Sequence, residues 1–349
     1  KEKLRIGFAG PATECVLFLE ALCEPCCAEI ATLSAIAVSD RRDPLLQEKL
    51  KLLPKTPSLY LRVEELLLNE ALEALVIATP PGMRPAHAMS ALAHGCHVLI
   101  RSPPALTVRG AQRIVRVQEE NNRFVAVYRS GKFGLRAEIL KWALASRLIG
   151  QPLFVADIAF GLPGSTPNVC VGGDPTNHNR IQGGGLLLVR GVRDMAFLRY
   201  ICGDVVEVFG TEATLEPERV LEDPHGAILQ RFGVQAEDTV VGTFRFANGA
   251  HCLYLRSWCG RGEALGPVLY IWGSDGCLKN DKVFFERRQA VDLEELWKEK
   301  AGPDQIEAVF PGGLRDPFLL ELRAFSVSYT HLRAHETRHD LVCRLLLEK

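Results

Sequence analysis

Short runs of apolar residues alternate with helix-like segments from the start of the chain to residue 127. The apolar runs are residues 4–9, 35–38, 75–78, 97–100 and 124–127, and the helix-like segments between them are residues 16–22, 86–94 and 108–121. Runs that are apolar throughout are typical of strands buried on both faces of a parallel sheet, with helices as the crossovers. We therefore predict an α/β fold with an N-terminal Rossmann dinucleotide-binding domain at residues 1–127.

The pattern changes after residue 150. A strand at residues 154–158 is followed by a loop rich in Gly, Pro and Asn, and then by a helix at residues 185–202. Longer β-rich segments come next, with turn residues between them, at residues 205–215, 239–246, 251–258 and 267–272. Such turns are typical of antiparallel strands. We predict a C-terminal α+β domain at residues 128–325 with a largely antiparallel open sheet, whose free face could pack against a second copy in a homo-oligomer.

Composition narrows the class of protein. The 349 residues suffice for roughly two domains of about 150 residues each, and 41 Lys and Arg against 42 Asp and Glu give a net charge of −1. Nucleic-acid-binding domains are usually strongly basic, so no nucleic-acid partner is expected. No apolar run reaches the ~18 residues that a membrane-spanning helix needs, so no membrane association is expected either. The N-terminal residues lack the apolar region of a signal peptide, and the 11 cysteines are scattered. These features predict reduced thiols and a cytoplasmic protein.

One cysteine cluster needs separate consideration. Cys23 and Cys26 have the CxxC spacing of a redox or metal pair, and Pro25 between them is equally consistent with an ordinary loop. Zinc would require a second pair at suitable spacing, and none follows. We therefore expect no metal site.

Candidate cofactor chemistry begins at the end of the first apolar run. A G-x-G-x-x-G turn would fall on residues 10–15, where only Gly10 is a glycine and Ala12 and Cys15 replace the other two. Thr13 could donate its hydroxyl to a phosphate, whereas Glu14 adds a negative charge. A helix N-terminus at this place binds a pyrophosphate in dinucleotide folds. An ordinary strand-to-helix turn is the competing interpretation.

One acidic and two positively charged residues follow the second apolar run. Asp40 lies where the ribose hydroxyls of NAD would bind, and Arg41 and Arg42 could instead hold the additional phosphate of NADP. A solvated turn residue is the alternative for Asp40. The predicted cofactor is therefore NAD or NADP.

Four longer segments carry a specific resemblance. Leu75-Val76-Ile77-Ala78-Thr79-Pro80-Pro81, residues 93–107, residues 150–154 and residues 183–206 are similar to segments of the glucose–fructose oxidoreductase and inositol dehydrogenase family, Gfo/Idh/MocA. The resemblance covers residues 4–325. It implies an NAD(P)-dependent oxidoreductase that acts on a sugar, a polyol or a related small hydroxy or keto compound.

The resemblance also implies site residues, several of which depart from the family's pattern. Thr79, Pro80 and Pro81 would line the cofactor, as would Arg101 and Pro103. Members typically carry Glu-Lys-Pro in this second turn, and here Ser102 stands at the lysine position. Serine does not supply the positive charge of lysine.

The family's catalytic helix is altered as well. Its Asp and His positions, four residues apart on one helix face, are Val189 and Arg193. Arginine stays protonated and is a poor base. Asp194 is the next residue, about 100° around the helix. We therefore assign Ser102 and Arg193 to the reaction site.

Further candidates lie outside these positions. His178, in a polar loop, is a candidate catalytic residue or a solvated histidine. Tyr128, Arg129 and Lys132 follow the last strand of the first domain, where this family lines its cleft. The changed positions leave a second hypothesis open, a catalytically impaired nucleotide-binding or scaffold protein that retains the fold.

The C-terminal residues divide at about residue 325. Residues 316–325 resemble the helix on which the family's chain returns to its first domain, and the similarity ends there. Residues 326–349 resemble a translated vector sequence, so we expect a non-native tail and a natural chain that continues differently. His331, His335 and His339 have the spacing of a zinc site on one helix face, which a foreign tail explains better.

Overall fold

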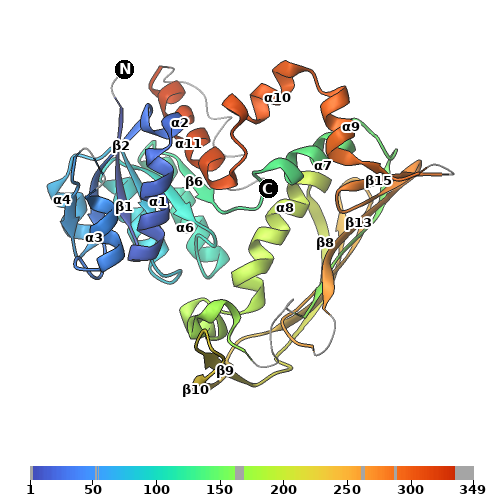
Figure 1. Ribbon diagram of the computed structural model, residues 1–349, viewed down its shortest axis with the longest axis horizontal. Helices are drawn as coiled ribbons and strands as arrows, with labels where there is room; N and C mark the ends of the chain where they lie inside the picture. Colours follow the sequence, from blue (N-terminus) through green and yellow to red (C-terminus); the bar gives the residue numbers. More distant parts are fainter. Residues whose placement is uncertain are drawn as a thin grey trace. The chain divides into compact units, whose positions relative to one another are not determined.

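The computed structural model describes residues 3–51, 53, 55–161, 169–260, 264–286 and 289–334 (Figure 1). These residues form two compact units. The first contains the described residues up to Phe133 together with those from Leu314 onward, and the second is Gly134–Gly313. No helix in the described part of the chain is long and apolar enough to cross a membrane.

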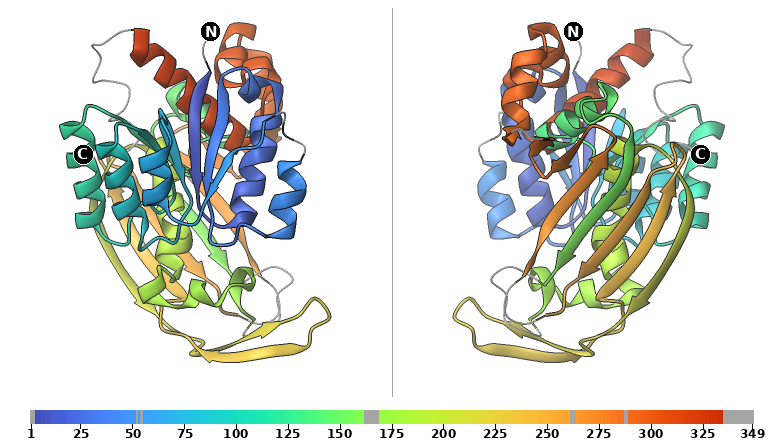
Figure 2. Two further views of the ribbon diagram at one scale, coloured as in Figure 1. Left: turned by 90° about the vertical axis from the view of Figure 1, so that its left-hand side faces the viewer. Right: turned by 90° about the vertical axis from the view of Figure 1, so that its right-hand side faces the viewer.

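The first unit is a Rossmann-like parallel sheet with helices on both faces (Figure 2). Its six strands have the order β3-β2-β1-β4-β5-β6, and all neighbouring pairs are parallel. The strands are β1 (Leu4–Ala9), β2 (Ala31–Ala37), β3 (Ser58–Tyr60), β4 (Ala74–Ile77), β5 (His97–Arg101) and β6 (Val125–Tyr128). The helices are α1 (Ala12–Cys23), α2 (Pro25–Ala28), α3 (Pro44–Leu50), α4 (Val63–Asn69), α5 (Arg84–Ala93), α6 (Val108–Glu120) and α11 (Pro317–Ala334).

The apolar runs of the sequence form two cores, one on each face of this sheet. Alternate residues of a strand point to opposite faces, so Phe8 and Val76 belong to one core and Leu75 and Ile77 to the other. Side chains of α1, α3 and α11 complete the first core, and those of α4, α5 and α6 complete the second. The predicted N-terminal Rossmann fold is confirmed.

The helix α11 belongs to the first unit. Leu322 and Phe325 are buried in the core around β1, so the chain returns to this unit after completing the second. The expected second domain, residues 128–325, therefore differs from the second unit at both ends. The helix also continues past residue 325: Ser326 is buried and donates its hydroxyl to the Leu322 carbonyl at 2.9 Å. Residues 326–334 are thus helical, and residues 335–349 lie outside the described residues.

The second unit is built on an eight-stranded sheet with the order β16-β15-β14-β13-β7-β12-β11-β8. Its strands are β7 (Pro152–Phe160), β8 (Val205–Ala213), β11 (Thr239–Phe246), β12 (His251–Ser257), β13 (Leu265–Gly273), β14 (Gly276–Lys279), β15 (Lys282–Phe285) and β16 (Val291–Asp292). A separate hairpin consists of β9 (Glu218–Glu222) and β10 (Ile228–Gly233). Only β7 and β12 pair in parallel among the neighbours of the large sheet, which confirms the largely antiparallel sheet.

One face of this sheet is covered and the other is open. Its helices are α7 (Leu135–Ala145), α8 (Val192–Cys202), α9 (Leu293–Lys300) and α10 (Pro303–Val309), and α8 continues a wide helical turn at Leu187–Gly191. Along β11 the side chains alternate between buried and exposed from Val240 to Phe246. The broad face seen in the right-hand view of Figure 2 carries no helix of the described residues.

Candidate functional site

The turn between β1 and α1 requires a glycine at its first position. A Cβ built on Gly10 would lie 2.7 Å from the Cβ of Ala78, closer than two such atoms can approach. Pro11 is the N-cap of α1 and has no capping side-chain hydrogen bond. The first-turn N–H groups of a helix have no partner within the helix and favour negative charge. The helix therefore begins with the features of an anion-binding turn.

The two missing glycines have different consequences. Ala12 keeps the side chain at the second position small. Cys15, at the third, is fully buried in the core beside Phe8 and Phe18, and burial raises the pKa of its thiol to about 12. The thiol is therefore neutral and inert, and it fills the contact between helix and sheet.

The charged residues after β2 are exposed. Asp40 accepts a hydrogen bond from the Arg42 backbone N–H at 2.8 Å, which closes a short turn. The Arg41 carbonyl accepts a hydrogen bond from the Gln47 side chain at 2.7 Å. Both Asp40 and Arg41 present their side chains at the carboxyl end of β2, the place expected for ribose recognition.

The turns after β4 and β5 are joined by an arginine that the sequence analysis did not identify. Arg84 is buried and donates to the Thr79 carbonyl and to the Pro103 carbonyl, both at 2.7 Å. The Thr79 hydroxyl lies 3.0 Å from Nδ1 of His87. Burial, followed by repulsion from Arg101, lowers the pKa of Arg84 to about 10, so it remains a cation at neutral pH. Arg84 thereby fixes the two turns that were expected to line the cofactor.

Two arginines of the first unit share one carboxylate. Arg101 at the end of β5 lies 3.0 Å from Oε1 of Glu14, and Arg129 after β6 lies 3.6 Å from Oε2. The next residue after Arg101 is Ser102, whose backbone N–H donates to the Tyr128 carbonyl at 3.0 Å. Burial raises the pKa of Tyr128, so its phenol stays protonated. Glu14, which looked unfavourable in the sequence, is compensated by these two cations.

The backbone at Arg129 is held by α11. Arg129 has a φ of 54°, a conformation that residues other than glycine rarely adopt. Its N–H donates to Oε2 of Glu321 at 2.6 Å, and the N–H and hydroxyl of Ser130 donate to Oε1 at 3.0 and 2.9 Å. Burial raises the pKa of Glu321 despite these bonds. The carboxylate of α11 therefore fixes the end of β6.

These residues fit a dinucleotide. The uncapped N-terminus of α1 faces the carboxyl edge of the sheet, Asp40 stands exposed after β2, and Glu14 with Arg101 and Arg129 carries a net charge of +1. A bound pyrophosphate is negative and would be favoured by such a surplus of positive charge. The net charge of this edge is therefore positive despite the negative charge of Glu14.

The helix α8 and the wide turn before it lack the acid and the base expected of an acid–base site. Val189 lies in the wide turn and Arg193 in α8. Asp194 is engaged by the sheet: it accepts from the Tyr254 hydroxyl at 3.0 Å and from Nε of Arg256 at 2.8 Å. Arg256 is buried and also pairs with Asp157 at 2.6 Å. This ion network connects α8 to β7 and β12. The feature of the sequence that could have indicated it is a charged residue within each apolar strand, Asp157 in β7 and Arg256 in β12.

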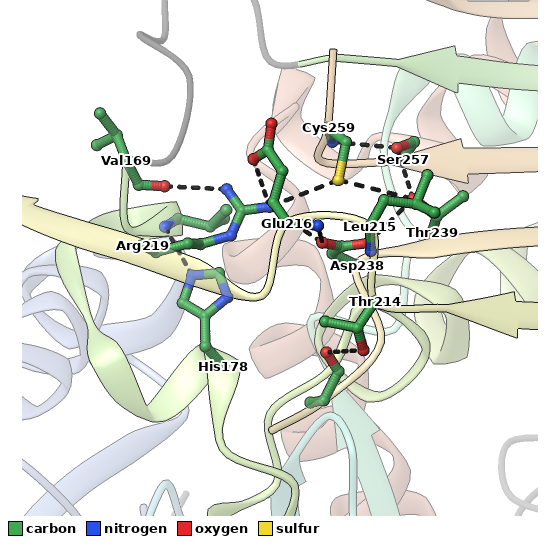
Figure 3. Close-up of polar contacts among 12 residues, drawn as sticks. Val169, His178, Thr214, Leu215, Glu216, Arg219, Asp238, Thr239, Ser257 and Cys259 are labelled. Carbon is green, nitrogen blue, oxygen red and sulfur yellow. Dashed lines mark hydrogen bonds and ion pairs between the residues drawn. The ribbon is translucent and has the colours of Figure 1, made fainter. Parts of the chain in front are cut away.

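His178 lies in a buried polar cluster (Figure 3). It is 2% exposed, and its ring packs against Phe232 and Trp258. Its Nε2 accepts the Val171 backbone N–H at 2.9 Å, while Nδ1 has no hydrogen-bond partner. Burial, and then the nearby Arg219, lowers the pKa of His178 to about 4. The solvated loop histidine considered from the sequence is therefore a neutral, packed side chain.

The zinc pattern of the C-terminal region is largely outside the structure. His335 and His339 are not among the described residues, and for His331 only the backbone is described. Within the described ranges, no group of three or more His, Cys, Asp or Glu side chains is arranged to hold a metal ion.

Two family models match the chain. The oxidoreductase family with an NAD-binding Rossmann fold matches residues 29–129, and the GFO/IDH/MocA C-terminal domain matches residues 139–279. The chain belongs to the GFO/IDH/MocA family of oxidoreductases. Among curated proteins, no sequence matches it.

Solved structures share the fold of this GFO/IDH/MocA protein. An oxidoreductase from Thermotoga maritima is 20% identical with a TM-score of 0.65, over 93% of this chain and 95% of that one. The WlbA dehydrogenase from Bordetella pertussis, in complex with NADH and UDP-GlcNAcA, is 18% identical with a TM-score of 0.67, over 99% and 88%. Levoglucosan dehydrogenase, in complex with NADH and levoglucosan, is 17% identical with a TM-score of 0.67, over 93% and 88%.

Proposed function

We propose that this protein uses NAD or NADP to oxidise or reduce a sugar, a polyol or a related small hydroxy or keto compound. The observation that carries the proposal is the carboxyl edge of the first sheet, where an uncapped helix N-terminus, an exposed acid after β2 and two cations after β5 and β6 occur together. Proteins with the same fold contain NADH with UDP-GlcNAcA or with levoglucosan, which supports a sugar-related substrate.

In this proposal each end of a strand contributes to the cofactor site. Gly10, Ala12 and Thr13 border the pyrophosphate, and Asp40 or Arg41 holds the ribose. The remaining lining residues come from the turns that Arg84 joins, and they are Thr79, Pro80, Pro81, Arg101 and Pro103. The bound nicotinamide supplies the hydride acceptor or donor.

Ser102 and Arg193 occupy the reaction site in the proposal. Oxidation of a hydroxyl requires removal of its proton as hydride leaves, and a positioned base contributes typically about 10²–10⁴-fold. A serine hydroxyl and a guanidinium can donate hydrogen bonds to a substrate oxygen, but neither is an effective base at neutral pH. We therefore expect slow turnover.

Cofactor binding is tested by titrating the purified protein with NADH and NADPH and following reduced-cofactor fluorescence. Asp40→Ala should weaken NADH binding by about 1.5–3 kcal/mol, the value of hydrogen bonds to a charged group. Asp43→Ala is the matched control, because Asp43 caps α3 and accepts the Leu46 N–H instead. Equal dissociation constants for wild type and Asp40→Ala would remove Asp40 from the site.

The second candidate function is a nucleotide-binding or scaffold protein without turnover. It is favoured by the residues Ser102, Val189 and Arg193, which replace the family's Lys, Asp and His. Assay of the wild type against inositols, hexoses and their oxidised forms separates the two functions. The triple variant Ser102→Lys, Val189→Asp, Arg193→His should raise the rate above that of the wild type. Rapid turnover by the wild type would refute the impaired-site function.

The open face of the second sheet is the proposed surface for a homo-oligomer. Phe154 and Trp272 lie on neighbouring strands with ring centroids 5.9 Å apart, and they are 41% and 39% exposed. Phe209 at β8 is 74% exposed. Large apolar side chains exposed on one sheet face are typical of interaction surfaces. Light scattering should give a dimer or higher oligomer for the wild type and a monomer for Phe154→Glu; a monomeric wild type would contradict the proposal.

A further inference from the structure

The carboxyl edge of the first sheet holds more positive than negative charge. Three guanidinium groups gather there, those of Arg84, Arg101 and Arg129, and one acidic side chain, Glu14, pairs with two of them. The carboxylate of Glu321 is used by the backbone N–H groups of Arg129 and Ser130. One carboxylate does not neutralise the two guanidinium groups that it contacts, so this edge is suited to a further anion.

The arginine pair follows strands that lie on the opposite side of β1 from β2. In the strand order β3-β2-β1-β4-β5-β6, Asp40 follows β2 and Gly10 follows β1, whereas Arg101 and Arg129 follow β5 and β6. Neighbouring strands are about 4.8 Å apart, so β5 and β6 end roughly 10 and 14 Å beyond β1. A dinucleotide with its ribose at β2 and its pyrophosphate at β1 extends toward these strands. Because both guanidinium groups reach Glu14 in the first turn of α1, an anion bound by them would lie beside the pyrophosphate, where the second reactant would meet the cofactor.

The contacts of Glu14 show what the pair can bind. Each carboxylate oxygen faces a different arginine, at 3.0 and 3.6 Å, and the Glu14 side chain is only 13% exposed although it lies in the first turn of a helix. Guanidinium groups converging on one carboxylate are the usual arrangement for recognising carboxylates and phosphates. The unusual backbone at Arg129 is fixed by Glu321, so the second arginine is placed by the fold rather than by Glu14 alone.

We infer that Arg101 and Arg129 form a subsite for a carboxylate or phosphate group of the substrate, and that Glu14 is an internal carboxylate that competes for this subsite. The inference rests on the proposed function in one respect, because it assigns the anion to the substrate of that reaction. Exchange of Glu14 for an external carboxylate or phosphate keeps each arginine paired with an anion. The substrate class is therefore an acidic sugar, a sugar phosphate or a hydroxy acid.

The experiment compares charged and uncharged sugars on the full chain. Isothermal titration measures binding of D-glucuronate, D-glucose 6-phosphate and D-glucose to the wild type and to Glu14→Gln, with and without saturating NADH. Removal of the competing charge should tighten binding of both charged sugars about tenfold and leave D-glucose unchanged, and added salt should reduce the gain. The matched control is Glu20→Gln on the same helix, because Glu20 pairs with Lys49 at 2.6 Å on the surface.

The arginine variants complete the test. Arg101→Gln and Arg129→Gln should each weaken binding of the charged sugars about tenfold, because each removes a charge-assisted contact. Arg101→Lys and Arg129→Lys keep the charge and lose the planar fork, so they should give intermediate values. Thermal melts establish whether each variant is folded. If a glutamine variant is not folded, the lysine variant at the same position is used in its place.

The outcomes separate the subsite from the cofactor site. Binding of NADH is followed by its own fluorescence. If Glu14→Gln binds NADH more tightly than the wild type but binds neither charged sugar more tightly, the arginines serve the cofactor's phosphates and the subsite is refuted. Equal affinities for all three sugars in Glu14→Gln also refute it. If NADH does not bind at all while the gain for charged sugars persists, the proposed function fails and the anion subsite stands.

Discussion

Acidification should destabilise the second unit through His178. The ring is 2% exposed, and burial lowers its pKa to about 4, from the ordinary histidine value of about 6.5. Between these values the unfolded chain binds a proton at this residue and the folded chain does not. Stability is therefore complete above the unfolded pKa, falls as the pH decreases from about 6.5, and levels off below about 4.

The size of the effect follows from the two pKa values. One pKa unit corresponds to 1.36 kcal/mol, so protonation of His178 should cost about 3 kcal/mol in full and about 2 kcal/mol by pH 5. Other groups also titrate in this range. The effect must therefore be measured as a difference from a variant that lacks the imidazole.

His178→Phe is that variant. Phenylalanine keeps the ring contacts with Phe232 and Trp258 and removes the acceptor of the Val171 N–H. At pH 8 the variant should be less stable by about 1–3 kcal/mol, the cost of one unpaired buried donor. As the pH falls to 5, the difference between wild type and variant should shrink by about 2 kcal/mol.

Tryptophan fluorescence is a suitable probe for this measurement. All four tryptophans of the chain, Trp142, Trp258, Trp272 and Trp297, lie in the second unit, so urea unfolding followed by their emission reports that unit. His225→Asn, at an exposed turn, is the control and should leave the pH profile as in the wild type. Parallel pH profiles for wild type and His178→Phe would refute the reasoning.

Two further substitutions test packing and charge. Arg256→Met removes the cation from the buried carboxylate of Asp157 and should destabilise the second unit by about 3–5 kcal/mol in the same urea assay. Arg245→Met, at an exposed ion pair, should change it by less than about 1 kcal/mol. Gly10→Ala places a Cβ 2.7 Å from that of Ala78 and should lower stability by about 1–3 kcal/mol in circular dichroism melts. Gly82→Ala, with its nearest atom at 3.7 Å, should be nearly neutral; similar effects of the two alanines would contradict the packing argument.

The sequence predicted the first sheet well because its signal is local. Runs such as residues 75–78 are apolar at every position, and only a strand covered on both faces uses such a run. The edge strand β3 has three residues and the helix α3 has seven, so neither produces a period that can be recognised. In the second unit, β14 and β15 were missed for the same reason.

The candidate site was predictable where it depends on strand ends. Gly10, Asp40, Thr79 and Ser102 follow parallel strands, whose carboxyl ends meet at one edge, so their shared location follows from the order of the elements. Arg84 was overlooked, although it stands at helical spacing with the buried positions of α5.

Pairings between distant residues could not be deduced. Glu321 bonds to the backbone of Arg129 across 192 residues, and Asp194 bonds to Arg256 across 62. No local pattern identifies such partners. The compensation of Glu14 by Arg101 and Arg129 is of the same kind and required the structure.

The return of α11 to the first unit affects the order in which the protein can be made. The second unit lies within the first in the sequence, so a ribosome releases every residue of the second unit before it releases the helix that completes the first. Until Glu321 emerges, the N–H groups of Arg129 and Ser130 lack their carboxylate, and the core beside β1 lacks Leu322 and Phe325. A nascent chain should therefore acquire a folded second unit first, and the ability to bind a nucleotide should appear only when α11 has docked.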